Sequence, residues 1–369
     1  VVAEKEGSTH QPGDIAELSQ QGYQFLRENL LSEAENRFSE ILERDPENNY
    51  ALVGLGDTAR KRRHFEKAIG YYERCLEIHP DNNYALFGLA DCYRSLKHFN
   101  KAIRVWERYL QHDDENVTVL TRVADAHRKV HNFDRSKQLY EKVLEQEPDN
   151  AYALIGLGHL HYDFRDYDGA LSYWERMYEI SGSQVDIRVL TSLGNCHRKR
   201  KTFEEGLRYF EEALAKEPNN FYALFGMADC CRGLGRAEDS LRYWNRILDR
   251  DPENKVILTR AGDAYRSLGE TETARRYYER ALDIEFDTYA VLGLAVLNRR
   301  GGKLEDAIVS LEGLVKNDAK NPRFYHELAE AYLENGSRKD AITTLERAVE
   351  EGAVNRQVSE TLEKLRSGR

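Results

Sequence analysis

Three polar residue types recur at a fixed interval in this sequence, and they are the side chains that could do chemistry. A tyrosine, an aspartate seven residues later and an arginine three residues after that recur about every 34 residues, as in Tyr84, Asp91 and Arg94. An aspartate and an arginine three residues apart share one face of a helix, where they can form an ion pair. The same groups can instead hold a partner, because guanidinium groups bind carboxylates or carbonyls and tyrosine offers flat area with a polar tip.

Both interpretations of this Asp/Arg ladder stay open from the sequence. In the first, the pairs of successive repeats interlock into an ion-pair network that fixes the pitch of the array. In the second, they form a track for a bound peptide. The regular members of the candidate partner-binding surface are Tyr84, Tyr152, Tyr222, Asp91, Asp125, Asp229, Asp263, Arg94, Arg128, Arg198, Arg232 and Arg266.

Departures from the ladder are the better candidates for specificity. One repeat has a histidine and a tyrosine in place of the Asp/Arg pair, and others add an arginine or an asparagine. His159 and His161 do not form a metal-binding pair, because residues two apart on a helix point to different faces. The departing residues are Arg122, His159, Tyr162, Arg188, Asn195 and Arg260.

Catalysis has little support in the sequence. It contains no glycine-rich phosphate loop, no nucleophile elbow and no constellation of metal ligands. The carboxylates of the ladder are evenly spread instead of paired in a pocket. We therefore expect a non-enzymatic protein with no catalytic residue, no metal site and no cofactor.

The elements that position these side chains repeat with the same period. The segment YALFGLADCYR from Tyr84 recurs as YALVGLGDTAR from Tyr50, YALIGLGHLHY from Tyr152 and YALFGMADCCR from Tyr222. A fixed period near 34 residues indicates an array of stacked repeats. Apolar residues fall at helical spacing twice within a repeat, which predicts a helical hairpin. Proline in the links stops the second helix, and a following Asn or Asp can cap the next one.

Ten such repeats can be laid end to end along nearly the whole chain. After them, Val358, Leu362 and Leu365 fall at helical spacing between Arg356 and Arg366, which predicts a helix that caps the last hydrophobic face. The expected organisation is a polar linker at residues 1–14, repeats one to five at 15–186, repeats six to ten at 187–353 and the capping helix at 354–369.

The pattern resembles the tetratricopeptide repeat (TPR). In the second repeat, the matching residues are Leu52, Leu55, Gly56, Ala68, Tyr72 and Pro80. The resemblance implies an all-α fold, a right-handed α-solenoid or superhelix of about ten hairpins. Its first helices line a concave groove with the residues at positions 2, 5, 6, 9, 12 and 13 of each repeat, where position 1 is the first residue of the repeat, such as Asn83 in the third. It also implies that position 24, held by Trp106, Trp174 and Trp244 in three repeats, lies in the core. The carboxylate clamp that the family uses for chaperone tails is not matched, because position 6 is glycine in five repeats.

Composition narrows the choice of partner. The 64 acidic and 54 basic residues give a net charge of −10, which disfavours nucleic acid. No apolar run reaches the roughly 18 residues of a membrane span, so we expect no membrane insertion. The five cysteines are typical of small core residues in a reduced compartment. No signal peptide is visible, which favours a cytoplasmic location, although a removed export signal or lipoprotein leader would leave no trace.

The expected function is that of a scaffold or adaptor that binds a protein or peptide segment in the concave groove. The alternative is an architectural protein that self-associates through terminal or convex faces, in which case the ladder is structural. Repeats four apart resemble each other, with 138 residues from Tyr84 to Tyr222, which suggests a duplicated block with two equivalent groove segments. Two extra residues near Gly182 mark the best candidate for a hinge.

Overall fold

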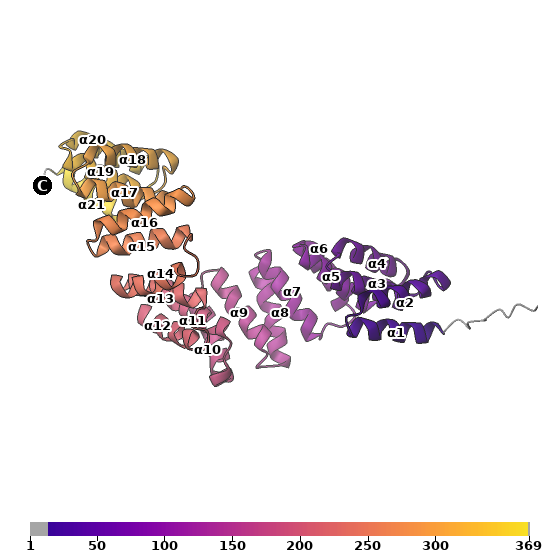
Figure 1. The fold of residues 1–369 in the computed structure, drawn as a ribbon. Helices are drawn as coiled ribbons and strands as arrows, with labels where there is room; N and C mark the ends of the chain where they lie inside the picture. The colour runs from indigo at the N-terminus through magenta and orange to yellow at the C-terminus, as the bar shows by residue number, and fades with distance from the viewer. Residues whose placement is uncertain (1–13, 368–369) are drawn as a thin grey trace, which may run out of the picture. The chain divides into compact units, whose positions relative to one another are not determined.

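A computed structural model describes residues 14–367 of the protein. Over this range the chain forms 21 α-helices, one short 3-10 helix and no β-strand (Figure 1). The first twenty α-helices pair into ten successive hairpins, and the last one follows them alone. The predicted all-α solenoid of about ten helical hairpins is therefore confirmed.

The chain divides into two compact units, with the boundary between Ser183 and Gln184. Within each unit, every hairpin packs on the next one along the chain. The N-terminal unit contains α1 (Ile15–Arg27), α2 (Leu31–Arg44), α3 (Asn49–Lys61), α4 (Phe65–Ile78), α5 (Asn83–Ser95), α6 (Phe99–Leu110), α7 (Val117–Lys129), α8 (Phe133–Gln146), α9 (Ala151–Asp163) and α10 (Tyr167–Ser181). The 3-10 helix is Gly182–Gln184. The C-terminal unit contains α11 (Ile187–Arg200), α12 (Phe203–Lys216), α13 (Phe221–Gly233), α14 (Ala237–Leu248), α15 (Lys255–Ser267), α16 (Thr271–Ile284), α17 (Thr288–Arg300), α18 (Leu304–Asn317), α19 (Pro322–Glu334), α20 (Arg338–Glu350) and α21 (Arg356–Arg366).

Asparagine side chains begin most of the first helices. Asn48 Oδ1 accepts a hydrogen bond from the Ala51 amide at 3.1 Å, and Asn82 Oδ1 accepts one from the Ala85 amide at 2.9 Å. These caps satisfy amides that the first turn of a helix leaves without a partner. The same cap recurs at Asn116, Asn150, Asn220 and Asn254. The expected capping role of the residues that follow the proline links is confirmed.

The turn inside each hairpin uses one residue with a left-handed backbone. At this place φ lies between 58° and 80° in all ten hairpins. The last four hairpins have glycine there, and the first six have Asn29, Arg63, Lys97, His131, Arg165 and Lys201. Because a Cβ makes this conformation unfavourable, the first six turns carry a backbone cost that the last four avoid.

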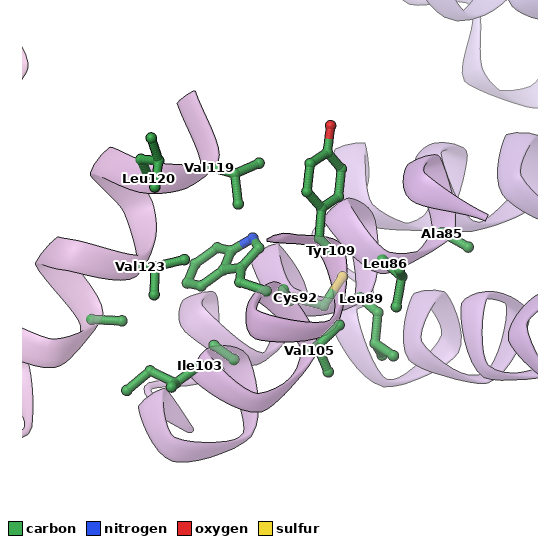
Figure 2. Packing of buried hydrophobic residues seen from close by; sticks show 14 of the residues in the cluster. Ala85, Leu86, Leu89, Cys92, Ile103, Val105, Tyr109, Val119, Leu120 and Val123 are labelled. Carbon is green, nitrogen blue, oxygen red and sulfur yellow. The ribbon is translucent and has the colours of Figure 1, made fainter. Parts of the chain in front are cut away.

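A large aromatic residue from the second helix fills the centre of each of the first eight hairpins. Trp106, Trp174 and Trp244 are 0%, 1% and 0% exposed, which confirms their predicted place in the core. Figure 2 shows the packing of buried side chains from α5, α6 and α7, with Cys92 and Val123 among them. Removing an aromatic side chain of this size from such a core costs about 3–5 kcal/mol.

Glycine at position 6 of the first helix is a packing requirement. A Cβ on Gly88 would lie 2.3 Å from Cζ of Tyr72, and one on Gly226 would lie 2.2 Å from Cζ of Phe210. Both glycines are buried against the aromatic residue at position 24 of the preceding hairpin. The expectation that position 6 faces the groove is therefore wrong at these glycines, because a tyrosine or phenylalanine ring occupies the space of a side chain.

Position 6 carries a longer side chain where the preceding hairpin has tryptophan at position 24. Arg122 is at position 6 of the hairpin after the one that contains Trp106, and Arg260 is at position 6 of the hairpin after the one that contains Trp244. Both arginines are half-buried. The aromatic residue in the core thus correlates with whether the next first helix presents a polar group at this position.

The last helix covers the end of the stack. Val358 and Leu362 of α21 are 0% and 7% exposed, and they share one hydrophobic cluster with Phe324 of α19 and Leu345 of α20. The outward-facing residues of α21 are exposed and mostly polar. The predicted capping helix is confirmed.

Candidate functional site

The candidate surface is formed by the first helices. First helices of successive hairpins contact one another, as α1 does with α3, α3 with α5 and α11 with α13. We name the surface formed by their side chains at positions 2, 5, 6, 9, 12 and 13 the groove face. The ladder residues lie on the groove face. Some of them form ion pairs or hydrogen bonds with other residues of the chain, and others remain available to a partner.

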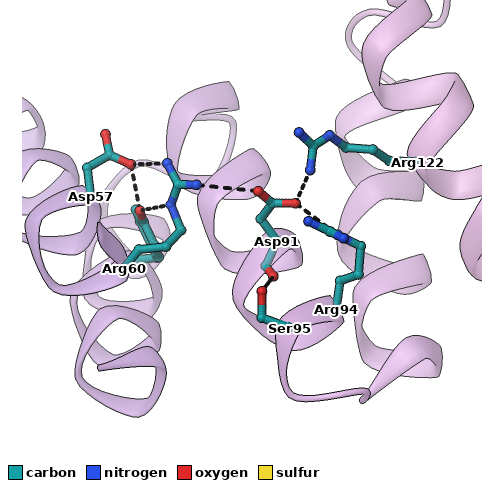
Figure 3. A network of polar contacts seen from close by, with 7 residues as sticks. Asp57, Arg60, Asp91, Arg94, Ser95 and Arg122 are labelled. Carbon is teal, nitrogen blue, oxygen red and sulfur yellow. Dashed lines mark hydrogen bonds and ion pairs between the residues drawn. The ribbon is translucent and has the colours of Figure 1, made fainter. Parts of the chain in front are cut away.

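Asp91 of α5 is surrounded by three arginines (Figure 3). Arg60 of α3 donates to Oδ2 at 3.3 Å, and Arg94 donates from Nε to Oδ1 at 3.2 Å. Arg122 of α7 donates to the same Oδ1. Arg60 also donates to Asp57 at 2.9 Å, so the ion pairs connect three hairpins. Because the Asp91 side chain is only 9% exposed, these charged donors replace the water that it lacks.

The C-terminal unit has a similar group around Asp229, with two arginines instead of three. Arg198 of α11 donates to Oδ2 at 2.7 Å, and Arg232 donates to Oδ1 at 2.7 Å. Burial acts to raise the pKa of Asp229, but the hydrogen bonds from Arg232 and Arg198 outweigh it and hold the pKa below its usual value. Asp91 and Asp229 lie 138 residues apart, the step expected for a duplicated four-repeat block.

Arg122 and Arg260 occupy equivalent positions but have different surroundings. Arg122 pairs with Asp91, and its guanidinium carbon lies 4.9 Å from the centre of the Phe87 ring. Within residues 14–367, Arg260 makes no hydrogen bond and no ion pair. The groove face of the C-terminal unit therefore presents an open guanidinium group where the N-terminal unit has a paired one.

Two tyrosines connect the ladder to the core. The Tyr72 hydroxyl donates to Asp57 Oδ1 at 2.8 Å, and the Tyr278 hydroxyl donates to Asp263 Oδ1 at 2.9 Å. Arg266 completes the second group, with its guanidinium 3.1 Å from Asp263. These aspartates are held by a residue of the core as well as by the arginine of their own helix.

Other ladder arginines reach a carboxylate of the next hairpin. Arg128 donates to Asp125 at 2.7 Å and also bonds Asp163 of α9. Arg299 of α17 bonds Glu334 of α19 in the same way. The side chains of Arg128 and Arg299 are 12% and 14% exposed, so these guanidinium groups are occupied within the array.

The fifth repeat replaces the ladder pair by two rings that pack on tryptophan. The His159 ring meets Trp174 edge-on, with ring centres 5.2 Å apart, and the Tyr162 ring lies 5.9 Å from the same indole. Burial lowers the pKa of His159, and the charge of Arg128 lowers it further. His159 is therefore an uncharged, half-buried ring at neutral pH.

The two departures in the sixth repeat bond residues that are close to them in the chain. Arg188 pairs with Asp186, the residue that caps α11, at 2.7 Å. Asn195 Oδ1 accepts a hydrogen bond from Arg198 at 3.2 Å. Neither residue extends the ion-pair network to a neighbouring hairpin through these bonds.

The tyrosines at position 2 are among the most exposed of the predicted site residues. Tyr84, Tyr152 and Tyr222 are 77%, 79% and 68% exposed. In the part of the chain that the structure describes, their hydroxyl groups make no hydrogen bond. Large aromatic side chains are the groups that most often anchor a protein partner.

Sequence reasoning missed a cavity of about 360 Å³ at the N-terminal end of the groove face. It is lined by Tyr23, Asn49, Tyr50, Val53, Asp57, Asn82 and Tyr84. Of these, only Tyr84 is one of the predicted site residues, although Tyr50 and Asp57 stand at ladder positions 2 and 9. The signal that could have revealed the cavity is Tyr23, which stands at position 9, where five other repeats carry aspartate. A larger hollow of about 670 Å³ lies beside the second helices α6 and α8.

The described residues were searched for a metal site, a membrane-spanning helix and reactive cysteines. Among residues 14–367, no three or more His, Cys, Asp or Glu side chains converge as a possible metal site. None of the helices described is long and apolar enough to cross a membrane. All five cysteines are buried and none of them forms a disulfide, which confirms their core placement, and burial raises the pKa of Cys92 to about 12. Ion pairing, hydrogen bonding and aromatic contact remain as the interactions available on the groove face.

Comparison with protein-family models finds the tetratricopeptide repeat along the chain. A tetratricopeptide repeat model matches residues 20–82, 122–185, 193–255 and 259–322, and a second one matches residues 59–120 and 300–365. No curated protein matches the chain.

Several solved structures are similar in fold. PilW, described as a widely conserved type IV pilus biogenesis factor, is 13% identical with a TM-score of 0.51, over 58% of this chain and 98% of its own. Yeast Tom70 is 15% identical with a TM-score of 0.48, over 96% of both chains. A tetratricopeptide repeat protein from Parabacteroides merdae ATCC 43184 is 18% identical with a TM-score of 0.41, over 74% of this chain and 94% of its own.

At these identities the likeness to solved structures concerns the fold alone. The family models carry the assignment, because together they cover far more than half of the residues. The chain therefore belongs to the tetratricopeptide repeat family, whose stacked hairpins serve protein–protein interaction.

Proposed function

We propose that the protein is a non-enzymatic scaffold or adaptor that binds an extended protein or peptide segment along its groove face. The observation that carries this proposal is the set of exposed tyrosines at position 2. Tyr84, Tyr152 and Tyr222 each leave more than two thirds of their surface open, on helices whose other large aromatic residues are mostly half-buried. The proposed contacts are the predicted set, which consists of Tyr84, Asp91, Arg94, Arg122, Asp125, Arg128, Tyr152, His159, Tyr162, Arg188, Asn195, Arg198, Tyr222, Asp229, Arg232, Arg260, Asp263 and Arg266.

The members of this set do not contribute equally to the proposed binding. Asp91 and Asp229 are nearly buried and fully engaged by arginines, so they orient the arginines more than they meet a partner. Arg94 and Arg232 are 39% and 46% exposed and keep donors for a second acceptor. Arg260 has no acceptor among the described residues. Tyrosines would thus supply contact area, and these arginines would fix the position of partner carbonyls or carboxylates.

Site-specific photo-crosslinking tests the proposal and captures the partner in the same step. A photoreactive phenylalanine derivative replaces Tyr84, Tyr152 or Tyr222 in turn, in cells of the native host. The matched control places the same residue at Val309 of the second helix α18, which is 69% exposed and lies off the groove face. We expect specific crosslinked proteins from the groove positions and none of these from Val309.

The crosslinked species also distinguish the architectural alternative. If the groove positions and Val309 give the same products, the groove face is not the binding surface and the proposal fails. If the only product at the groove positions is a second copy of this chain, self-association replaces adaptor function. A mass from light scattering then gives the size of the assembly.

A further inference from the structure

The cavity at the N-terminal end of the groove face has the composition of a site for one cationic side chain. Tyrosines come from three successive first helices: Tyr23 from α1, Tyr50 from α3 and Tyr84 from α5. Val53 also lines it, together with two asparagines. In the part of the chain described, Asp57 is the only charged residue among the lining side chains.

The cavity is held open by contacts within the array. The Tyr23 hydroxyl donates to the Tyr50 carbonyl oxygen at 3.0 Å, and the Tyr23 ring packs edge-on against Phe38 at 5.0 Å. Burial raises the pKa of Tyr23 well above its usual value, and the nearby charge of Asp57 adds to this effect. The Tyr23 hydroxyl therefore stays protonated and fixed beside the carboxylate.

The two oxygens of Asp57 have different roles. Oδ1 accepts hydrogen bonds from Tyr72 at 2.8 Å and from Arg60 at 2.9 Å. Oδ2 has no partner among the described residues, as Figure 3 shows for the second oxygen of Asp57. Asp57 lines the cavity, its side chain is 27% exposed, and Oδ2 is not one of the buried atoms that lack a partner, so this oxygen is accessible to a ligand.

Arg60 pairs with Asp57 from outside the cavity. Its guanidinium is shared between Asp57 and Asp91, and it does not line the cavity. A bound anion would meet the Asp57 carboxylate with no lysine or arginine among the lining residues described. A cation would meet one open carboxylate oxygen and the faces of tyrosine rings, which attract positive charge.

We propose that this cavity, lined by Tyr23, Tyr50, Tyr84 and Asp57, binds the side chain of a lysine in the partner segment. A lysine ammonium is a compact charge that needs one strong acceptor, whereas a guanidinium fork is best matched by two free carboxylate oxygens. Only one oxygen of Asp57 is free. The volume of about 360 Å³ is ample for one extended side chain. This inference rests on the proposed binding of a segment along the groove face.

The test uses small probes and the whole chain. Nα-acetyl-lysine methylamide is titrated into protein labelled with 3-fluorotyrosine, and the fluorine resonances of Tyr50 and Tyr84 are assigned by Tyr→Phe substitution. The norleucine analogue has nearly the same shape without the charge, and the arginine analogue carries the other cation. We expect saturable shifts with the lysine probe and affinities weaker by about five-fold or more for the other two.

Matched variants separate binding from folding. Asp57→Asn keeps an oxygen for Tyr72 and Arg60 but removes the charge, and it is expected to weaken lysine binding about five-fold or more. Glu35→Gln makes the same kind of change at a carboxylate of the second helix α2, which pairs with Arg62 and Lys67, is 28% exposed and lies off the groove face. It is expected to leave the lysine affinity unchanged.

Each outcome decides the inference. Equal affinity for the norleucine or arginine probe, or unchanged lysine affinity in Asp57→Asn, would overturn it. Failure of the crosslinking experiment together with lysine binding here would reject the adaptor function and leave the lysine site standing. Crosslinking at Tyr84 without lysine binding would do the reverse.

Discussion

The ring of Tyr72 in α4 lies against the backbone of Gly88 in α5, so that a Cβ on Gly88 would come within 2.3 Å of the ring. Tyr72 is also the residue that holds Asp57 on the groove face. One side chain therefore sets the spacing between two hairpins and the orientation of a carboxylate on the surface.

Replacing Gly88 by alanine is expected to destabilise the protein. The new methyl group overlaps the Tyr72 ring, and overpacking of this kind costs about 1–3 kcal/mol. The melting temperature measured by circular dichroism should fall. The matched control is Gly313→Ala in α18, where no atom lies within 4 Å of the new Cβ and a gain of about 0.5–1 kcal/mol is expected. Equal effects of both changes would contradict the packing role of Gly88.

Replacing Lys201 by glycine is expected to stabilise the C-terminal unit. Lys201 has a φ of 65°, which costs a residue with a Cβ about 1 kcal/mol, and glycine removes this cost. The reverse change, Gly235→Lys, should destabilise by a similar amount because Gly235 has a φ of 75°. Denaturant melts of both variants test this pair. A loss of stability in Lys201→Gly would show that its left-handed turn carries no relievable cost.

The stability contributed by Asp229 should depend on pH. Its pKa is lower in the folded protein than in the unfolded chain, so the carboxylate stabilises the fold above the unfolded pKa of about 3.9. This contribution is lost as the pH falls toward the folded pKa. The difference in melting temperature between wild type and Asp229→Asn should be large near neutral pH and shrink below about pH 4.

An exposed aspartate provides the control for this pH dependence. Asp249→Asn, at the end of α14, should change the melting temperature little at any pH. A gap between wild type and Asp229→Asn that stays constant from neutral pH to acid would show that the arginines do not lower the pKa of Asp229.

The cysteines should be unreactive in the folded protein. All five are buried, and burial raises the pKa of Cys75 to about 11 and that of Cys230 to about 12, so little thiolate is present at neutral pH. Labelling with Ellman's reagent should be slow under native conditions and should reach five thiols in guanidinium chloride. Rapid labelling of the native protein would place at least one thiol at the surface.

Brief proteolysis under native conditions should cut the chain close to Gly182. The repeat period slips there, the proline stop is missing, and Gly182 has a φ of 52° that ends α10. Mass spectrometry should find fragment ends between Ser181 and Asp186. The links that contain Pro80 and Pro218 serve as internal controls and should stay intact. Cleavage at those links without cleavage near Gly182 would remove the support for a hinge.

Much of the fold was predictable because the repeat period and the apolar spacing both depend on residues within a single hairpin, where they indicate the helices and their buried positions. The bounds of the capping helix, Arg356–Arg366, and the core position of Trp106 follow from such local patterns. Contacts between hairpins were harder to predict from the sequence. The bond from Arg128 to Asp163 joins positions 12 and 13 of successive repeats, and its formation depends on the tilt between two first helices. A sequence pattern within one repeat does not specify that tilt.

The candidate surface was predictable in composition but not in detail. The recurrence of tyrosine, aspartate and arginine marked the first helices correctly as the place where polar groups gather. It did not separate the engaged Arg122 from the open Arg260, because the two share the same residue type and position. It also passed over Tyr23, because a single aromatic residue at position 9 becomes informative only beside Asp57 and Tyr84.

Tryptophan at position 24 precedes a first helix that carries arginine or serine at position 6, whereas tyrosine or phenylalanine there precedes glycine. A mutation of Gly88 to a recognition residue is blocked until Tyr72 changes, although the two residues belong to different hairpins. New specificity at this position must therefore evolve, or be engineered, in coupled pairs of one interior and one surface residue. Libraries that vary position 6 alone would fail at the five hairpins that have glycine there.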